Sequence, residues 1–135
     1  MTKDELYLKT IFCCIACDGD IATEEVNLVR NLCTKDNIFH NVDLEKLINS
    51  WISEINEQGG TFLQSYLNEL SSMALTETEQ LQLVSLAIKA IEIDNHVEYA
   101  EVKFFKKIRS ILTISDEAIL AEHPNNEDFL LPDIN

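Results

Sequence analysis

The sequence of 135 residues is long enough for one domain with a hydrophobic core and too short for two domains of ordinary size. Hydrophobic residues make up 46% of it, and it holds only three glycines and two prolines, a composition that favours helices over many short strands. The net charge is −14, with twelve acidic and five basic residues in each half (1–70 and 71–135), which argues against binding to nucleic acid or to anionic lipid. The acidic residues attract cations and basic partner surfaces, or simply keep the protein soluble.

Two further features concern membranes and targeting. No run of about 18 apolar residues occurs, so we expect no membrane-spanning segment and no direct membrane insertion. Residues 1–10 lack the basic and then apolar character of a signal peptide. These features predict a cytoplasmic protein.

Apolar residues recur at helical spacing along the chain and predict an all-α fold, a compact bundle of about seven helices. The expected helices cover, in chain order, residues 4–17, 23–35, 44–55, 61–73, 77–93 and 98–112, with a short seventh helix after Ser115. Gly59 should end the third helix in a left-handed conformation, and Thr76-x-x-Glu79 predicts a capping box at the start of the fifth.

The first and fifth of these helices differ from the rest. In IFCCIAC (11–17) and LQLVSLAIKAI (81–91) the apolar residues cover most of the helix circumference. A helix that is apolar on all sides is usually enclosed by others, so these two should form the centre of the bundle.

The chain ends in a segment without periodicity. We expect residues 1–122 to form a single domain and residues 123–135 (HPNNEDFLLPDIN) to form an acidic tail. Phe129, Leu130 and Leu131 should fold back onto the domain, with a partner-binding motif as the alternative.

Four cysteines lie near the amino terminus, at Cys13, Cys14, Cys17 and Cys33. The Cys14-x-x-Cys17 spacing is found in redox and zinc sites. Here, however, it lies inside an apolar helical run with no histidine nearby in sequence, and structural zinc requires four ligands. We therefore expect these cysteines to act as small buried hydrophobic residues.

Each of the two enclosed helices is followed by a similar segment, ACDGDIATEEV (16–26) and EIDNHVEYAEV (92–102). At an offset of 76 residues, the matched pairs are Asp18 with Asp94, Gly19 with Asn95, Ile21 with Val97, Glu25 with Glu101, and Val26 with Val102. The match predicts an internal duplication of a helix-loop-helix unit. We call the two segments the first and the second joint.

Helix chemistry alone can explain the joints. Gly19 and Asn95 are suited to a chain that leaves a helix with positive φ. Glu25 and Glu101 fall in the first turn of the next helix, where a carboxylate can accept hydrogen bonds from free amides. Ile21 and Val97 should anchor the two loops in the core.

A second interpretation is a metal site. Hard cations prefer clustered carboxylate and carbonyl oxygens, and both joints are rich in carboxylates. If the two copies pack with pseudo-twofold symmetry, both loops lie on one face and form a single acidic site for a divalent cation such as calcium, magnesium or manganese. The candidate ligands are Asp18, Asp20, Glu24, Glu25, Asp94, Glu98 and Glu101. His96 lies beside them and is expected to be a surface residue.

The segments DGDIATEEV (18–26) and DNHVEYAEV (94–102) resemble the D-G-x-I-x-x-x-E pattern at the helix joints of the tellurite-resistance TerB-like family. The resemblance spans roughly residues 4–112, although only the two short motifs are specific. It implies a helical domain that binds divalent metal and works in stress-response assemblies, associated with the membrane through partner proteins. The same domain type occurs in some DnaJ-like co-chaperones. Asn95 departs from the pattern, which puts a second metal site in doubt.

Other site classes find no support in the sequence. An EF-hand that begins at Asp18 would have Ala22 at its fifth position and Val29 at its twelfth, neither of which can act as a side-chain ligand. Glu-x-x-His, HExxH, GxxxxGK[ST] and GxSxG are absent. We therefore expect a non-enzymatic module that binds a divalent cation and docks protein partners. The alternatives are a purely structural interaction domain whose carboxylates only cap helices, and a hydrolase with paired carboxylates.

Overall fold

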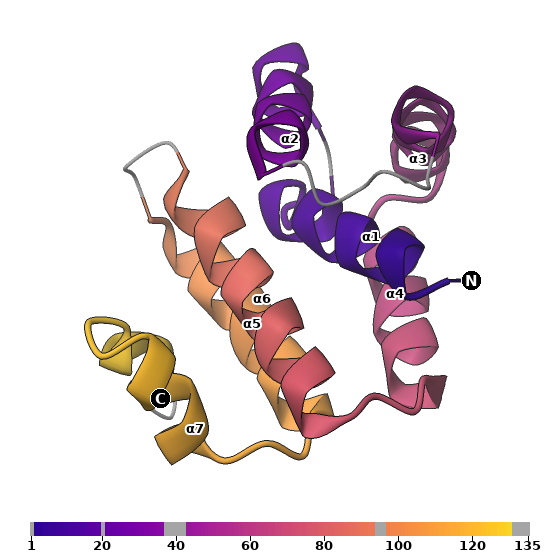
Figure 1. Cartoon of the computed structure of the whole chain (residues 1–135). Helices are drawn as coiled ribbons and strands as arrows, with labels where there is room; N and C mark the ends of the chain where they lie inside the picture. The colour runs from indigo at the N-terminus through magenta and orange to yellow at the C-terminus, as the bar shows by residue number, and fades with distance from the viewer. Residues whose placement is uncertain (1, 20, 37–42, 94–96, 131–135) are drawn as a thin grey trace.

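The computed structural model describes residues 2–19, 21–36, 43–93 and 97–130. In these ranges the chain forms seven α-helices and one short 3-10 helix, with no strand, so the all-α prediction is confirmed (Figure 1). The elements are α1 (Lys3–Ile15), α2 (Thr23–Asp36), α3 (Leu44–Gln58), α4 (Gly60–Ser72), α5 (Glu77–Glu92), α6 (Tyr99–Ile111), α7 (Asp116–Glu122) and η1 (Glu127–Phe129).

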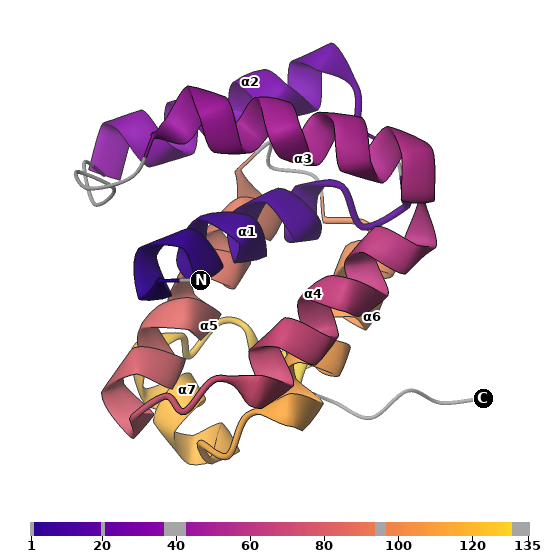
Figure 2. The same ribbon diagram turned by 90° about the vertical axis from the view of Figure 1, so that its right-hand side faces the viewer.

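Helix α1 lies in the middle of the molecule. The helices α2 and α3 run side by side across one side of it, and α4, α5 and α6 lie on the other side (Figure 2). Its main contacts are with α2, α4, α5 and α6, the contact with α5 is the most extensive, and the Phe12 ring also meets Trp51 of α3. Helix α7 packs against α5, at the edge of the bundle.

The burial of α1 and α5 confirms that they form the centre of the bundle. Every residue of α1 from Leu6 to Ile15 is buried, and so are eight residues of α5. By contrast, α3 buries only Ile48, Trp51 and Ile55, as expected of a helix with one apolar stripe. Rings from three helices meet at the α1 surface, where Phe12 lies 5.7 Å from Trp51 and 5.8 Å from Phe62 between ring centroids.

The predicted helix ends are present. Glu79 and Thr76 form the reciprocal hydrogen bonds of a capping box at the start of α5, and the Ser115 side chain accepts a hydrogen bond from the Ala118 amide at the start of α7. Gly59 ends α3 with φ of +59°, a conformation that side chains with a Cβ rarely adopt. These local signals act within a few residues, which is why the sequence alone places them correctly.

Two polar residues of α1 are buried and find partners inside the protein. The Thr10 hydroxyl donates to the Leu6 carbonyl at 2.8 Å, so the Tyr66 hydroxyl, 2.6 Å from Thr10 Oγ1, is the donor to it. Lys9 pairs with Glu69 at 2.6 Å, and its ammonium lies 4.9 Å from the centroid of the Phe62 ring. Within the described residues no buried side-chain nitrogen or oxygen lacks a hydrogen bond.

Beyond α7 the chain returns to the bundle. Phe129 is buried with its ring centroid 5.4 Å from that of Phe105, and Leu130 packs against the core. The Asn126 amide donates to the Glu92 carboxylate at 2.9 Å. Leu131, which was also expected to fold back, lies outside the described residues. The side chains of Phe129 and Asn126 thus fix residues 126–130 against α5 and α6.

The Thr10–Tyr66 hydrogen bond generates the first prediction. Thr10→Val leaves the buried Tyr66 hydroxyl without a partner and should lower the free energy of unfolding by about 1–3 kcal/mol. Tyr66→Phe removes the donor but leaves Thr10 bonded to Leu6, and should cost about 0.5–1.5 kcal/mol. Urea denaturation of both single variants and the double variant measures the coupling. A double variant whose loss equals the sum of the two single losses would contradict this account.

Candidate functional site

The first joint leaves α1 through a tight turn. The Gly19 amide donates to the Ala16 carbonyl at 3.0 Å, and Gly19 has φ of +86°, as its place in the motif predicts. A Cβ on Gly19 would lie 3.4 Å from the Gly60 nitrogen, so the joint also packs closely against the turn between α3 and α4. Ile21 is buried and anchors the loop in the core as expected. The Glu25 carboxylate accepts a hydrogen bond from the Ala22 amide at 2.8 Å.

The second joint repeats the capping interaction. The Glu101 carboxylate accepts a hydrogen bond from the Glu98 amide at 2.9 Å, which is the same interaction as that of Glu25 at an offset of 76 residues. The expected anchor of this loop is wrong, however, because Val97 is 43% exposed and does not enter the core. Tyr99, the next apolar residue, is 64% exposed. Asp94, Asn95 and His96 lie outside the described residues.

The two joints meet at one hollow of about 70 Å³. Four of the seven candidate ligands line it, two from each joint, and the full lining is Ile15, Cys17, Asp18, Glu25, Glu98, Ala100 and Glu101. Glu24 is exposed and does not line the hollow, and Asp20 and Asp94 lie outside the described residues. We call this space the acidic hollow. Its volume accommodates a small cation with a few water molecules.

The pKa of the Cys17 thiol responds to the negative charges around the acidic hollow. Burial and then the negative charges of Glu101, Asp18 and Glu98 raise the pKa of the Cys17 thiol to about 12. Three carboxylates from both joints therefore act on one sulfur atom. A positive charge in the same space would have the opposite effect on this thiol.

The other cysteines behave as predicted. Cys13, Cys14 and Cys33 are buried, and Cys17 is half-buried. Burial raises the pKa of the Cys13 and Cys14 thiols, so both are unreactive at neutral pH. In the described part of the chain, no three side chains of histidine, cysteine, aspartate or glutamate are grouped as a metal site in their present positions.

A second hollow, of about 270 Å³, lies between α4 and α6 and is not predicted by the sequence motifs. Its lining is Cys17, Gly60, Leu63, Gln64, Leu67, Ala100, Lys103, Phe104 and Lys107. Cys17 and Ala100 also line the acidic hollow, so the two spaces adjoin. A signal was present in the sequence, because four of the ten basic residues fall within residues 103–109 of an acidic chain.

No protein-family model, curated protein or solved structure matches this chain. Within the described residues, none of the helices has the length and apolar character needed to span a bilayer.

Gly19 and Gly60 offer a matched pair of substitutions. Gly19→Ala places a Cβ at positive φ and close to the Gly60 backbone, and should cost about 1–2 kcal/mol of unfolding free energy. Gly60→Ala has open space around its Cβ and should leave stability unchanged or raise it by up to about 1 kcal/mol. Urea denaturation measures both. Equal losses in the two variants would show that Gly19 is not constrained by its φ.

The Cys17 thiol gives a prediction on pH dependence. Glu101→Gln keeps an oxygen for the Glu98 amide and removes one of the charges that raise the pKa of Cys17. The pKa should fall below about 12, so more thiolate is present at pH 9 and iodoacetamide should alkylate Cys17 several-fold faster. Mass spectrometry of the alkylated protein over time measures the rate. Glu79→Gln, the same change at the start of α5, should leave the rate unaltered.

Proposed function

We propose that this chain is a non-enzymatic, acidic helical module that binds a divalent cation in the acidic hollow and docks protein partners. One observation supports cation binding: carboxylates of both joints line the same small space. They are Asp18 and Glu25 of the first joint and Glu98 and Glu101 of the second. The two carboxylate pairs are far apart in sequence, and each pair alone holds too few oxygens for calcium, which takes six to eight. Their convergence is the reason to propose one shared site.

The capping hydrogen bonds are compatible with this function. Glu25 and Glu101 each use one carboxylate oxygen for the amide of the residue that immediately precedes the helix. A carboxylate has two oxygens and several lone pairs, so the second oxygen can act as a ligand. The cap holds each glutamate at a fixed place in the first turn, and rotation of the Asp18 and Glu98 side chains would complete the ligand set around a cation.

The chemistry of the oxygen ligands indicates which type of cation the site would bind. Carboxylates and water are hard oxygen ligands, which suit calcium, magnesium or manganese better than metals that prefer sulfur or imidazole. Cys17 borders the hollow, but its raised pKa keeps the sulfur protonated and a poor ligand at neutral pH. The motif resemblance to TerB-like proteins supports the same choice and extends the proposal to a stress-response role beside the membrane, through partners.

A second candidate is a structural interaction domain without metal. It is favoured by the hydrogen bonds of Glu25 and Glu101, which give both glutamates a role in helix capping. It is also favoured by the lack of a ready-made group of metal ligands among the described side chains. In this case the two joints serve stability alone, and function lies in the surfaces that partners contact.

Charge-neutral substitutions separate the two candidates. The double variant Glu25→Gln with Glu101→Gln keeps both capping acceptors and removes two charges from the acidic hollow. We expect calorimetric titration of the wild-type protein with calcium, magnesium and manganese to show saturable binding, and the double variant to bind at least tenfold more weakly with an unchanged melting temperature. Glu79→Gln is the matched control, since Glu79 caps α5 in the same way but does not line the hollow.

The metal-free candidate predicts a different pattern. Saturable binding should then be absent or equal in all three proteins. Glu25→Ala with Glu101→Ala should lower stability by about 0.5–2 kcal/mol for each lost cap, whereas the glutamine variant should not. Alkylation of Cys17 adds an independent measurement, because a bound cation lowers the pKa of the thiol and accelerates the reaction at pH 9.

A further inference from the structure

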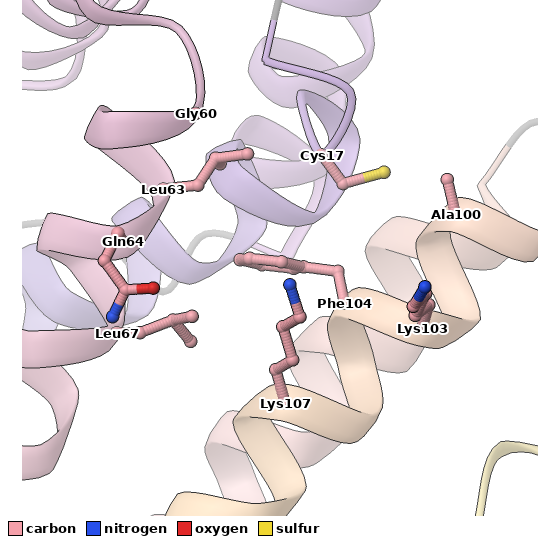
Figure 3. Close-up of a pocket in the computed structure, with 9 residues that line it drawn as sticks. All are labelled: Cys17, Gly60, Leu63, Gln64, Leu67, Ala100, Lys103, Phe104 and Lys107. Atoms are coloured by element: carbon pink, nitrogen blue, oxygen red, sulfur yellow. The ribbon is translucent and has the colours of Figure 1, made fainter. Parts of the chain in front are cut away.

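The second hollow has the form of a docking groove. It lies between α4 and α6, with Leu63, Gln64 and Leu67 on one side and Lys103, Phe104 and Lys107 on the other (Figure 3). Leu63, Leu67 and Phe104 are buried and form its apolar floor, whereas Gln64 and both lysines are exposed at its rim. We call this space the α4–α6 groove.

Its rim carries positive charge that the protein does not neutralise. Within the described residues, no carboxylate forms an ion pair with Lys103, Lys107 or the distant Lys46 of α3, whereas Lys3, Lys9, Arg30 and Arg109 are paired. What distinguishes Lys103 and Lys107 is their place, since both line one groove with an apolar floor in a chain with net charge of −14. An anionic group at the rim would gain attraction there and be repelled by the rest of the surface.

Exposed apolar side chains lie at one end of the same helix. Val97 and Tyr99 are the only large hydrophobic residues in the described part of the chain that are exposed. Tyr99 precedes Lys103 by four residues and is therefore its neighbour on the surface of α6. Tyrosine is enriched where proteins contact one another, since its ring is apolar and its hydroxyl tolerates water. The exposed Tyr99 thus lies beside Lys103 at the rim of the α4–α6 groove.

We propose that the α4–α6 groove docks an acidic amphipathic helix of a partner protein, with apolar side chains on the floor and carboxylates at Lys103 and Lys107. A volume of about 270 Å³ is below the range of pockets that enclose whole small molecules, about 300–1,000 Å³, and suits a few side chains of a docked segment. This inference deepens the partner-docking part of the proposed function and does not require a cation in the acidic hollow.

The groove and the acidic hollow nevertheless share Cys17 and Ala100. A partner in the groove would therefore lie beside the beginning of α6, where Glu98 and Glu101 face the hollow. A bound cation would reduce the negative potential near the groove and raise the affinity for an acidic partner. The two sites would then be coupled, with each ligand favouring the other.

Three fluorescent peptides test the proposal. Each has about 15 residues, which is close to the shortest length at which an isolated helix persists in water. The first has leucine and phenylalanine along one helical face and glutamate elsewhere, the second replaces glutamate by lysine, and the third replaces the apolar residues by serine. In anisotropy titrations with the full chain in EDTA, we expect the first peptide to bind at least tenfold more tightly than the other two.

Substitutions locate the binding surface. Lys103→Glu with Lys107→Glu should weaken binding of the first peptide at least fivefold, while Lys46→Glu with Lys89→Glu gives the same change in net charge on α3 and α5 and should have little effect. Equal losses in the two double variants would overturn the proposal, because they would show a dependence on net charge alone. Equal binding of the first and third peptides would also overturn it, because the apolar floor would then contribute nothing. Because all titrations are made in EDTA, their outcome is independent of whether the acidic hollow binds a cation.

Discussion

The enclosure of α1 is the constraint on which the rest of the structure depends. A helix buried on every side has no water to satisfy its polar side chains, so each must find a partner in a neighbouring helix. Thr10 is satisfied by Tyr66 of α4, and Lys9 by Glu69 of the same helix. These two interactions lie along one side of α1 and fix the position of α4 against it. Apolar packing holds α4 against α1, whereas the hydrogen bond and the ion pair set the register of α4 along α1.

The same enclosure brings the two joints together. The helices α1 and α5 pack together in the centre, and the segments that follow them line the same hollow, although 76 residues separate the matched positions. The carboxylates there serve two purposes that are physically compatible. One oxygen of Glu25 or Glu101 stabilises the first turn of a helix, and the remaining negative charge adds to the potential of the acidic hollow. Burial of the Cys17 thiol, and then negative charges around the hollow, raise its pKa.

The surface of α6 shows a division of charge along one helix. Its beginning supplies Glu98 and Glu101 to the acidic hollow, and its middle supplies Lys103 and Lys107 to the α4–α6 groove. At the two ends of α6, Glu101 in the first turn and Arg109 in the last turn agree with the helix dipole and stabilise the helix itself. The proposed cation and the proposed acidic partner would therefore contact different side chains on adjacent parts of α6.

Features that depend on local physics were predictable from the amino-acid sequence. Helical periodicity fixed the all-α class and the enclosure of α1 and α5, and capping chemistry fixed the ends at Gly59, Thr76 and Ser115. Tertiary structure alone decided which distant side chains meet. The motif match predicted a buried Val97 by analogy with Ile21, yet Val97 is exposed, because burial depends on the neighbours of a loop and not on its own residues. Likewise, the acidic hollow and the α4–α6 groove each form between elements distant in sequence, and helix packing, which periodicity does not encode, sets their geometry.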